Sequence, residues 1–425
     1  MTMIRTLKSI VLAGTAVALM AVINVGCRDM EGDQEQIRKM NLERFPIDTI
    51  DTEHDWNLVK VMATTILADV DDNVARVQVL TANPYETDAE ILAETFATKG
   101  EKVSMIFEMP LTSKDFYVAA VTRQGRYYVK KVTDAGTVQS FADGVVMSEG
   151  NFHTPIYQTF TFLFEEDFPL PGDFDFNDVV LRISRQVPSQ NMLKLTVTLD
   201  AVGSNKKLAA AIRLGDVLYD QVAEVTIDEG LRFDEGLEGQ RFFIDDKLLW
   251  KKGLTGEAVI NLFDDAHWSL NPEQSDGIVS RPFLNTRKYE VNGESMTVEP
   301  QTRTYTIRFN EGVDASKILM SQIDPFIIEA YSSLSMEVHT YCYKFVESLW
   351  HYTSGNYNTD ERMAWALMVP DAKFRYPVEG ITIGRYRNGE IFGAYSRYYH
   401  SFGEWGRNHE KAIDWWQYPT SAQVY

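Results

Sequence analysis

The chain has 425 residues, too many for one ordinary hydrophobic core, so its length predicts two or three folded units. Hydrophobic residues make up 44% of it, which is typical of a globular protein. The formal net charge of −20 argues against nucleic acid and anionic lipid head groups as partners, since both require basic patches. Divalent cations and neutral glycans remain compatible with this charge.

Residues 1–26 have the pattern of a lipoprotein signal peptide. Arg5 and Lys8 precede a long uncharged stretch that ends immediately before Cys27. We expect cleavage before Cys27 and lipid on its thiol, although Asn24 departs from the apolar residue usual three places before the cysteine. A retained anchor is the alternative, since about 17–25 apolar residues span a bilayer, but Asn24 weakens that reading.

Residues 27–54 are expected to form a polar tether. The run from Arg28 to Glu35 is charged and polar, so it cannot bury apolar area. The only other cysteine is Cys342, so lipid on Cys27 would rule out an intramolecular disulfide.

Residues 55–145 predict a first β module of the immunoglobulin-like sandwich type. Short apolar runs separated by turn signals are typical of such a sandwich. The composition of Ala89–Ala97 would suit a helix, but its context favours a strand or a loop. The apolar runs are Val59–Val70, Ala75–Leu80, Val103–Met109, Phe116–Val121 and Tyr127–Val132.

Residues 146–425 predict a larger β-sandwich of jelly-roll type with long insertions. Apolar and polar residues alternate strictly in Leu193–Leu199 and again in Tyr305–Phe309, which indicates strands with one buried face. Sustained helical periodicity is scarce. We therefore expect an all-β protein.

The run Gly172-Asp173-Phe174-Asp175-Phe176-Asn177-Asp178 predicts a calcium site before a strand over Val179–Arg185. Ca²⁺ takes six to eight oxygen ligands, and alternating acidic positions can wrap such an ion. The run is no EF-hand, since aspartate and serine occupy the loop positions that need glycine and glutamate. An acidic surface turn is the alternative. The expected ligands are Asp167, Asp173, Asp175, Asn177 and Asp178, with Glu165 or Glu166 as further candidates.

The C-terminal stretch is dense in aromatic residues. Aromatic faces stack on the C–H faces of sugar rings, so the stretch offers a candidate glycan platform; packing in a core is the alternative, since large aromatic residues dominate cores. The candidate platform residues are Tyr398, Tyr399, Trp405, Trp415 and Trp416.

No catalytic constellation is recognisable. His267 lies near Asp265 and His339 lies near Cys342, but neither histidine forms a recognised zinc spacing. The sequence also contains no nucleophile elbow and no phosphate-binding glycine loop. We expect a protein that is not an enzyme.

The acidic run, with the preceding Phe164-Glu165-Glu166-Asp167, resembles the signature of the LruC-domain family, exported lipoproteins of Bacteroidota and some other Gram-negative bacteria. Leu262–His267, Asp324–Ile327 and Trp365–Pro370 fit the same pattern, so the resemblance covers residues 146–425. It implies a β-rich exported domain with a calcium site and brings no established catalytic activity. Acidic residues after Cys27 resemble a surface-export signal, so we expect the outer face of the outer membrane, with the periplasmic face as the alternative.

Three hypotheses follow. The first is a non-catalytic, calcium-stabilised surface lipoprotein that binds an extracellular glycan or host macromolecule. The second is a structural or adhesive component of a surface assembly, in which an exposed strand edge pairs with a neighbour. The third is a glycan-degrading enzyme.

Overall fold

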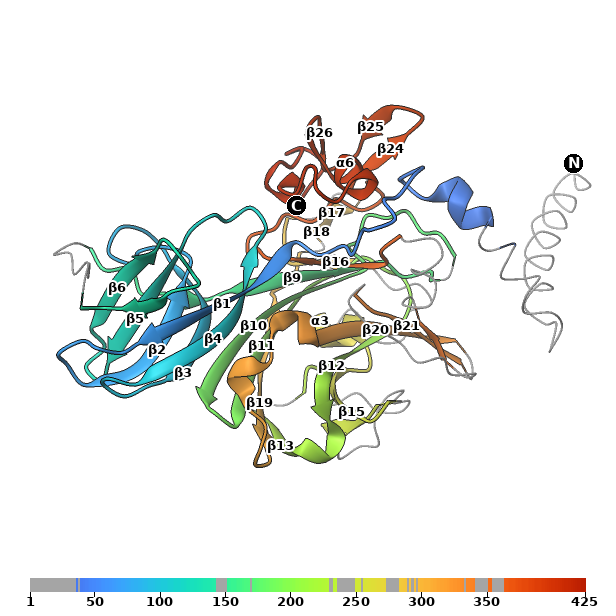
Figure 1. Cartoon of the computed structure of the whole chain (residues 1–425). Helices are drawn as coiled ribbons and strands as arrows, with labels where there is room; N and C mark the ends of the chain where they lie inside the picture. The colour runs from blue at the N-terminus through green and yellow to red at the C-terminus, as the bar shows by residue number, and fades with distance from the viewer. Residues whose placement is uncertain are drawn as a thin grey trace, which may run out of the picture. The chain divides into compact units, whose positions relative to one another are not determined.

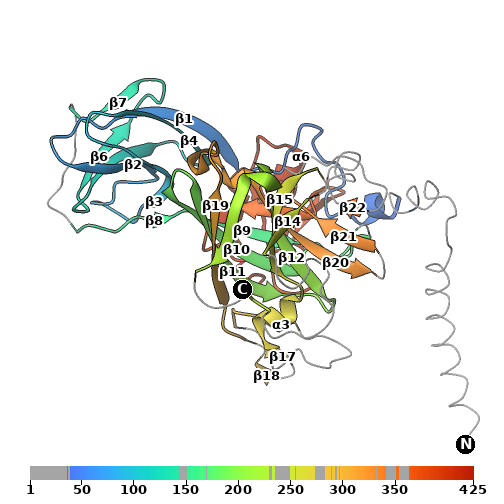
Figure 2. The same cartoon turned by 90° about the horizontal axis from the view of Figure 1, so that it is seen from below.

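The structure is a computed structural model. It divides into two compact units, residues 1–44 and residues 45–425. In the first unit, residues 39–44 are helical. All the strands belong to the second unit (Figures 1 and 2). The structure describes residues 36, 39–142, 151–168, 170–228, 232–234, 249–253, 255–272, 283–288, 290–291, 294–295, 297–331, 334–340, 351–353 and 363–425.

Two sheets near the start of the second unit form the first sandwich. A three-stranded sheet has the order β4-β1-β7, and a five-stranded sheet has the order β6-β5-β2-β3-β8. Their inward-facing residues share a separate hydrophobic cluster that includes Ile66, Val79 and Phe107. The strands are β1 (Val59–Leu67), β2 (Val74–Leu80), β3 (Glu90–Phe96), β4 (Lys102–Pro110), β5 (Phe116–Thr122), β6 (Tyr127–Val132), β7 (Val138–Ser140) and β8 (Ile156–Tyr157).

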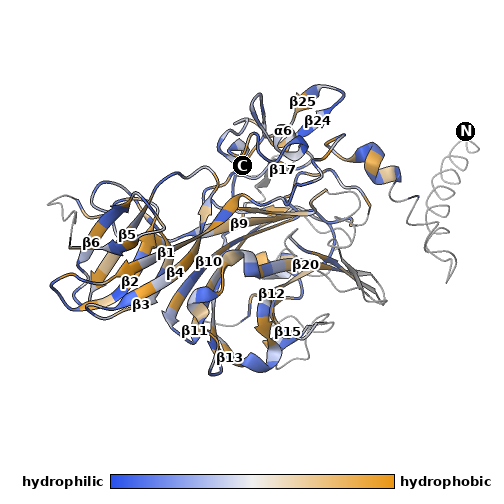
Figure 3. Ribbon diagram, viewed as in Figure 1, coloured by the Kyte–Doolittle hydropathy of each residue, from blue (hydrophilic) through white to orange (hydrophobic). Residues whose placement is uncertain are grey.

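The largest sheet has the order β13-β19-β11-β10-β9-β23, with β16 paired to β11. Buried and partly exposed residues alternate along the first part of β11, which gives one face to the core, whereas β9 and β23 are buried almost throughout. Figure 3 shows the hydropathy of the residues along these ribbons. The strands are β9 (Thr159–Phe164), β10 (Val179–Ser189), β11 (Met192–Val202), β13 (Val222–Ile227), β16 (Leu284–Asn285), β19 (Gln301–Phe309) and β23 (Ala366–Val369).

A second sheet in this part of the chain has the order β14-β15-β12-β20-β21-β22. Residues of both sheets, among them Leu195, Ile212 and Ile260, belong to one continuous hydrophobic cluster. β15 is buried along its whole length, so its side chains contact apolar groups on both faces. The strands are β12 (Leu208–Leu218), β14 (Trp250–Lys252), β15 (Glu257–Phe263), β20 (Ile323–Tyr331), β21 (Leu334–Val338) and β22 (His351–Thr353), and β17 (Glu290–Val291) pairs separately with β18 (Glu294–Ser295).

Residues 374–425 form a compact C-terminal cap that shares the large hydrophobic cluster. The cap holds two short hairpins and single helical turns. Its elements are β24 (Arg385–Arg387), β25 (Glu390–Phe392), β26 (Ser396–Arg397), β27 (His400–Ser401), α6 (Phe402–Arg407) and η4 (Trp415–Gln417).

Residues 45–54 correct one sequence-based expectation. They were expected to belong to a polar tether, yet Phe45, Ile47 and His54 are buried. Their backbone bonds explain why: Tyr386 N–H donates to Pro46 O at 2.9 Å, and further bonds join this segment to the cap. A segment that satisfies its backbone groups on a folded surface is ordered.

The all-β sandwich fold is confirmed, and Ala89–Ala97 contains a strand instead of a helix. The domain boundaries remain predictions. The proposed signal peptide, Cys27 and Cys342 lie outside the described residues. In the part of the chain that the structure describes, no helix is long and apolar enough to cross a membrane.

Candidate metal site

Strand register brings the two acidic segments together. β9 and β10 are antiparallel, and the terminal pair is Phe164 with Val179. Glu165 therefore leaves the end of β9 beside Asp178, which immediately precedes β10. The chain between them returns through the 172–178 loop, so acidic residues from both sides meet at one edge of the pair.

The 172–178 loop has an unusual backbone. Phe174 and Phe176 both have φ of 56°, a left-handed conformation that is rare for bulky residues. Both phenyl rings are buried, and Phe174 packs against Phe45 and Trp365. Burial of the aromatic residues offsets the backbone strain.

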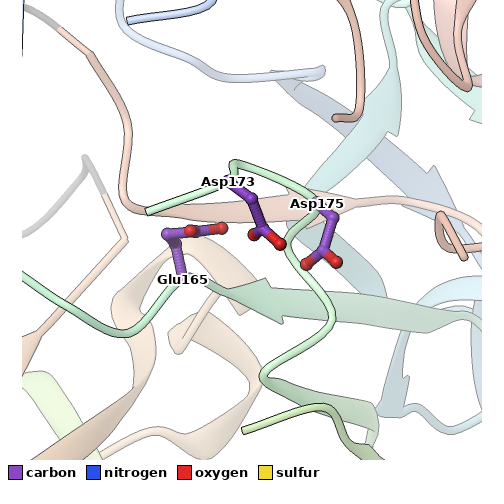
Figure 4. A group of neighbouring side chains, drawn as sticks. All are labelled: Glu165, Asp173 and Asp175. Carbon is purple, nitrogen blue, oxygen red and sulfur yellow. The ribbon is translucent and has the colours of Figure 1, made fainter. Parts of the chain in front are cut away.

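Three carboxyl groups converge in this loop (Figure 4). Glu165, Asp173 and Asp175 each offer an oxygen, and these oxygens all lie within 4.8 Å of one another. Oxygens bound to one Ca²⁺ at 2.3–2.6 Å can be at most about 5 Å apart, so the three groups are close enough to share an ion.

The buried carboxylates are held in place by backbone donors. Phe174 N–H donates to Glu165 Oε1 at 3.0 Å, and Phe176 N–H donates to Glu165 Oε2 at 3.2 Å. Gly380 N–H donates to Asp175 Oδ2 at 2.8 Å. Both Glu165 oxygens accept one of these hydrogen bonds each, and Asp175 Oδ1 accepts one from Asn177 N–H, so these three oxygens retain a further lone pair for a cation.

Several acidic side chains are buried close together at this site, which makes their charged forms unfavourable. Desolvation, followed by repulsion from neighbouring carboxylates, raises the pKa of Glu165, Asp175 and Asp178 well above their ordinary values. Burial and the Asp173 charge also raise the pKa of Glu379 to about 7. A bound cation would relieve this repulsion.

Asn177 supplies a second indication of a ligand. The residue is only 2% exposed, and its Oδ1 atom has no hydrogen-bond partner among the described residues. Its Nδ2 group donates to Asp175 Oδ2 at 2.9 Å and to Pro377 O at 3.2 Å. An unsatisfied buried oxygen beside the carboxylates costs about 1–3 kcal/mol unless something binds it.

The predicted ligands divide into two groups. Asp173 and Asp175 lie in the convergent trio, with Asn177 adjacent to it. Asp178 is buried and turns one oxygen to Glu166 N–H at 2.6 Å. The Asp167 carboxylate lies outside the convergent trio and pairs with Lys206, so its role as a ligand stays a prediction.

Glu165, one of the further candidates, completes the trio because it follows β9 directly and its carboxylate accepts from backbone N–H groups of the loop. The Lys206 ammonium also contacts Glu166 at 3.8 Å and Glu329 at 3.1 Å. Lys206 therefore offsets the charge of carboxylates outside the trio and, among the described residues, forms no salt bridge with the trio itself. The sequence offers no reason to include Glu379, because it lies about 200 residues after the acidic run and only the fold brings it near Asp173.

The match to a family model decides what the chain is related to. A model described as a domain of unknown function, DUF4842, matches residues 191–416, more than half of the chain. The protein belongs to the DUF4842 family. The 172–178 loop precedes the residues that the DUF4842 model matches.

Other comparisons add little to the DUF4842 match. No curated protein matches the sequence. Among solved structures, a Bacteroides ovatus protein that has a provisional description as a lipoprotein is similar at a TM-score of 0.48 and 16% identity, over 83% of this chain and 99% of that one.

The matched DUF4842 region includes all five aromatic candidates, and the structure corrects part of that prediction. Trp405 and Trp415 are 1% and 0% exposed and pack against each other with centroids 5.7 Å apart. They are core residues, and a fully buried ring cannot stack on a sugar. Trp416 is partly buried, and Tyr398 and Tyr399 are exposed.

The two histidine candidates of the DUF4842 region are also buried. His267 lies in the short helix α3 (Ala266–Leu270). Its backbone N–H donates to the carboxylate of Asp265, the residue that caps this helix. His339 Nδ1 lies 2.7 Å from Asp324 Oδ2 and its ring stacks on Phe326. Asp324 and Glu337 raise the pKa of His339 to about 9 despite its burial. This is the geometry of a structural ion pair.

Proposed function

We propose that the protein is an exported, non-catalytic lipoprotein whose fold is stabilised by Ca²⁺ and which binds an extracellular glycan. The convergence of Glu165, Asp173 and Asp175 around one point carries the calcium part of the proposal. The signal-peptide pattern that ends at Cys27 and the likeness of the acidic run to the LruC-domain family support export and lipid attachment, with the outer face of the outer membrane as the location.

The donor set favours a hard cation. The three converging groups are all carboxylates, and the neighbouring Asn177 offers an amide oxygen. Oxygen-only sites suit Ca²⁺ or Mg²⁺, whereas zinc and copper favour nitrogen and sulfur. Mg²⁺ demands near-ideal octahedral geometry, while Ca²⁺ tolerates an irregular loop. Ca²⁺ is therefore the proposed ion.

The test is the melting temperature of residues 28–425 in Ca²⁺, in Mg²⁺ and in chelator. We expect Ca²⁺ to raise it, because an ion at about 100 times its dissociation constant adds about 2.7 kcal/mol to the free energy of unfolding. Asp175→Asn should lose the rise, since it removes a charged ligand from the trio.

Asp220→Asn is the matched control, because this exposed aspartate lies outside the trio. It should keep the full calcium response. A wild-type protein that melts at one temperature in all three solutions would remove the metal from the proposal and leave the acidic loop as a hydrogen-bonded turn.

A further inference from the structure

The most exposed aromatic residues of the cap lie at the tip of one hairpin. Tyr398 and Tyr399 connect β26 to β27, and they are 62% and 71% exposed. Their ring centroids are 4.2 Å apart. We call β26, β27 and these two tyrosines the aromatic hairpin.

The sequence of this turn is poorly suited to its backbone. Tyr399 has φ of 67°, a conformation that glycine and asparagine adopt with least strain. The neighbouring hairpin of the cap uses the favoured pair, Asn388 and Gly389, with φ of 52° and 81°. A large ring kept in a strained and exposed position gains nothing from the core, which points to a role in binding.

The base of the aromatic hairpin is held by contacts with the end of the chain. His400 stacks on Tyr418 with centroids 4.1 Å apart, and its Nδ1 lies 2.8 Å from Asp414 Oδ1. The Arg397 guanidinium lies over the same Tyr418 ring, 4.8 Å from its centroid. A platform fixed at its base loses little conformational entropy when a ligand binds.

Two arginines of the cap lie on aromatic rings at or near the hairpin. Residues 385–407 contain four arginines and two glutamates, but Arg407 lies 3.8 Å from Asp48, and Asp414 contacts His400 of the hairpin. Arg385 and Arg397 lie over the rings of Phe392 and Tyr418, and neither forms a salt bridge with a carboxylate of the part of the chain that the structure describes. Their guanidinium groups keep donors for an anion.

We infer that the aromatic hairpin is the glycan site of the proposed function, on which this inference rests, and that it prefers acidic glycans. The faces of Tyr398 and Tyr399 would stack on the C–H faces of pyranose rings. The Arg397 guanidinium would bind a carboxylate or sulfate of the sugar through paired hydrogen bonds. A tip of two rings suits a few sugar residues better than a protein interface, which buries about 800 Å² on each partner.

The experiment measures binding of residues 28–425, in Ca²⁺, to immobilised hyaluronan, chondroitin sulfate and dextran. We expect the two acidic polymers to bind more tightly than neutral dextran, and their binding to weaken with salt. Equal binding to all three would overturn the preference for acidic glycans. Binding to none would overturn both this inference and the glycan part of the proposed function.

Tyr399→Gly separates binding from folding. Glycine fits a φ of 67°, so the variant should melt at the wild-type temperature or above, yet bind at least about tenfold more weakly. Phe96→Ala is the matched control, because Phe96 is 45% exposed and also lies beneath an arginine, Arg76. It should bind glycans as the wild type does.

Arg397→Gln tests the charge. It should weaken binding to hyaluronan and leave any dextran binding unchanged, because only the acidic polymer offers the guanidinium a carboxylate. Full binding by the Tyr399 and Arg397 variants would place the glycan site elsewhere and leave the proposed function intact. A wild-type protein that binds glycans through the hairpin but shows no change of melting temperature with Ca²⁺ would refute the metal site alone.

Discussion

Two glycines leave room for the side chains of the candidate metal site. A Cβ atom added to Gly172 would lie 2.0 Å from Glu165 Oε1, and one added to Gly203 would lie 1.9 Å from Asn177 Oδ1. Neither contact is sterically possible without displacement of the oxygen. Glycine is therefore required at both positions because a larger residue would collide with the site, and not because the backbone has a left-handed conformation there.

Gly172→Ala should weaken calcium binding by about tenfold or more, because the new methyl group displaces the Glu165 carboxylate from the trio. Calorimetric titration with Ca²⁺ measures this. Gly136→Ala is the control, since its Cβ would meet only the Asp134 side chain, at 3.3 Å. Unchanged affinity in Gly172→Ala would exclude Glu165 from the ligands.

His54 should limit stability in acid. Its ring is buried between Trp56 and Trp405, and desolvation lowers its pKa to about 4. The unfolded chain binds a proton near the ordinary value of 6.5, so stability is complete above pH 6.5 and falls as pH drops toward 4. The full loss is about 3 kcal/mol.

Denaturant unfolding between pH 7 and pH 4 checks this, with His54→Gln as the comparison. Glutamine does not titrate, and its amide can replace the Nε2–H donor to Trp405 O. The variant should therefore show a shallower acid limb. Parallel acid limbs in the two proteins would show that groups other than His54 set the acid sensitivity.

At the scale of elements, the acidic loop is bonded to a segment from the far end of the chain. Ile383 N–H donates to Phe174 O at 2.8 Å, and Gly380 N–H donates to the Asp175 carboxylate. Asn177 reaches Pro377 O in the same segment. The 377–383 segment opens the cap, so an ion that orders the loop also holds the cap on the sandwich.

Calcium should slow hydrogen exchange of the Gly380 and Ile383 amides. Both amides donate to the loop, and exchange requires that these bonds open. Mass spectrometry in Ca²⁺ and in chelator gives the comparison, and amides in the first sandwich, such as that of Val79, should exchange equally in both. Identical exchange of the 377–383 segment in the two solutions would separate the ion site from the cap.

At the scale of the whole molecule, the net charge bears on how the protein is held at a membrane. The net charge of −20 becomes −22 when residues 1–26, with Arg5 and Lys8, are removed. Such a surface is repelled by anionic head groups, so attachment depends on the lipid proposed for Cys27.

Cys27→Ser should release the protein from the membrane fraction of the native host, because the serine hydroxyl cannot take the thioether-linked lipid. Fractionation and immunoblotting measure the distribution, and Cys342→Ser is the control because the lipoprotein pattern does not include Cys342. Retention of Cys27→Ser in membranes after cleavage of residues 1–26 would refute lipid attachment at Cys27.

Sequence alone determined several strands, such as those over Leu193–Leu199 and Tyr305–Phe309, and the alternation of acidic and aromatic residues in the loop. Both are local properties, since a period of two in Leu193–Leu199 and the spacing of Asp173 and Asp175 need no distant partner. It also indicated that the acidic run comes before a strand, which β10 confirms.

Only the tertiary structure decided which side chains meet. Antiparallel register placed Glu165 in the trio, and the proximity of Lys206 drew Asp167 away from it. Packing of the cap buried Trp405 and left Tyr399 exposed. Contacts between residues far apart in sequence depend on the whole fold, so local spacing identifies the residue types of a site before it can identify its members.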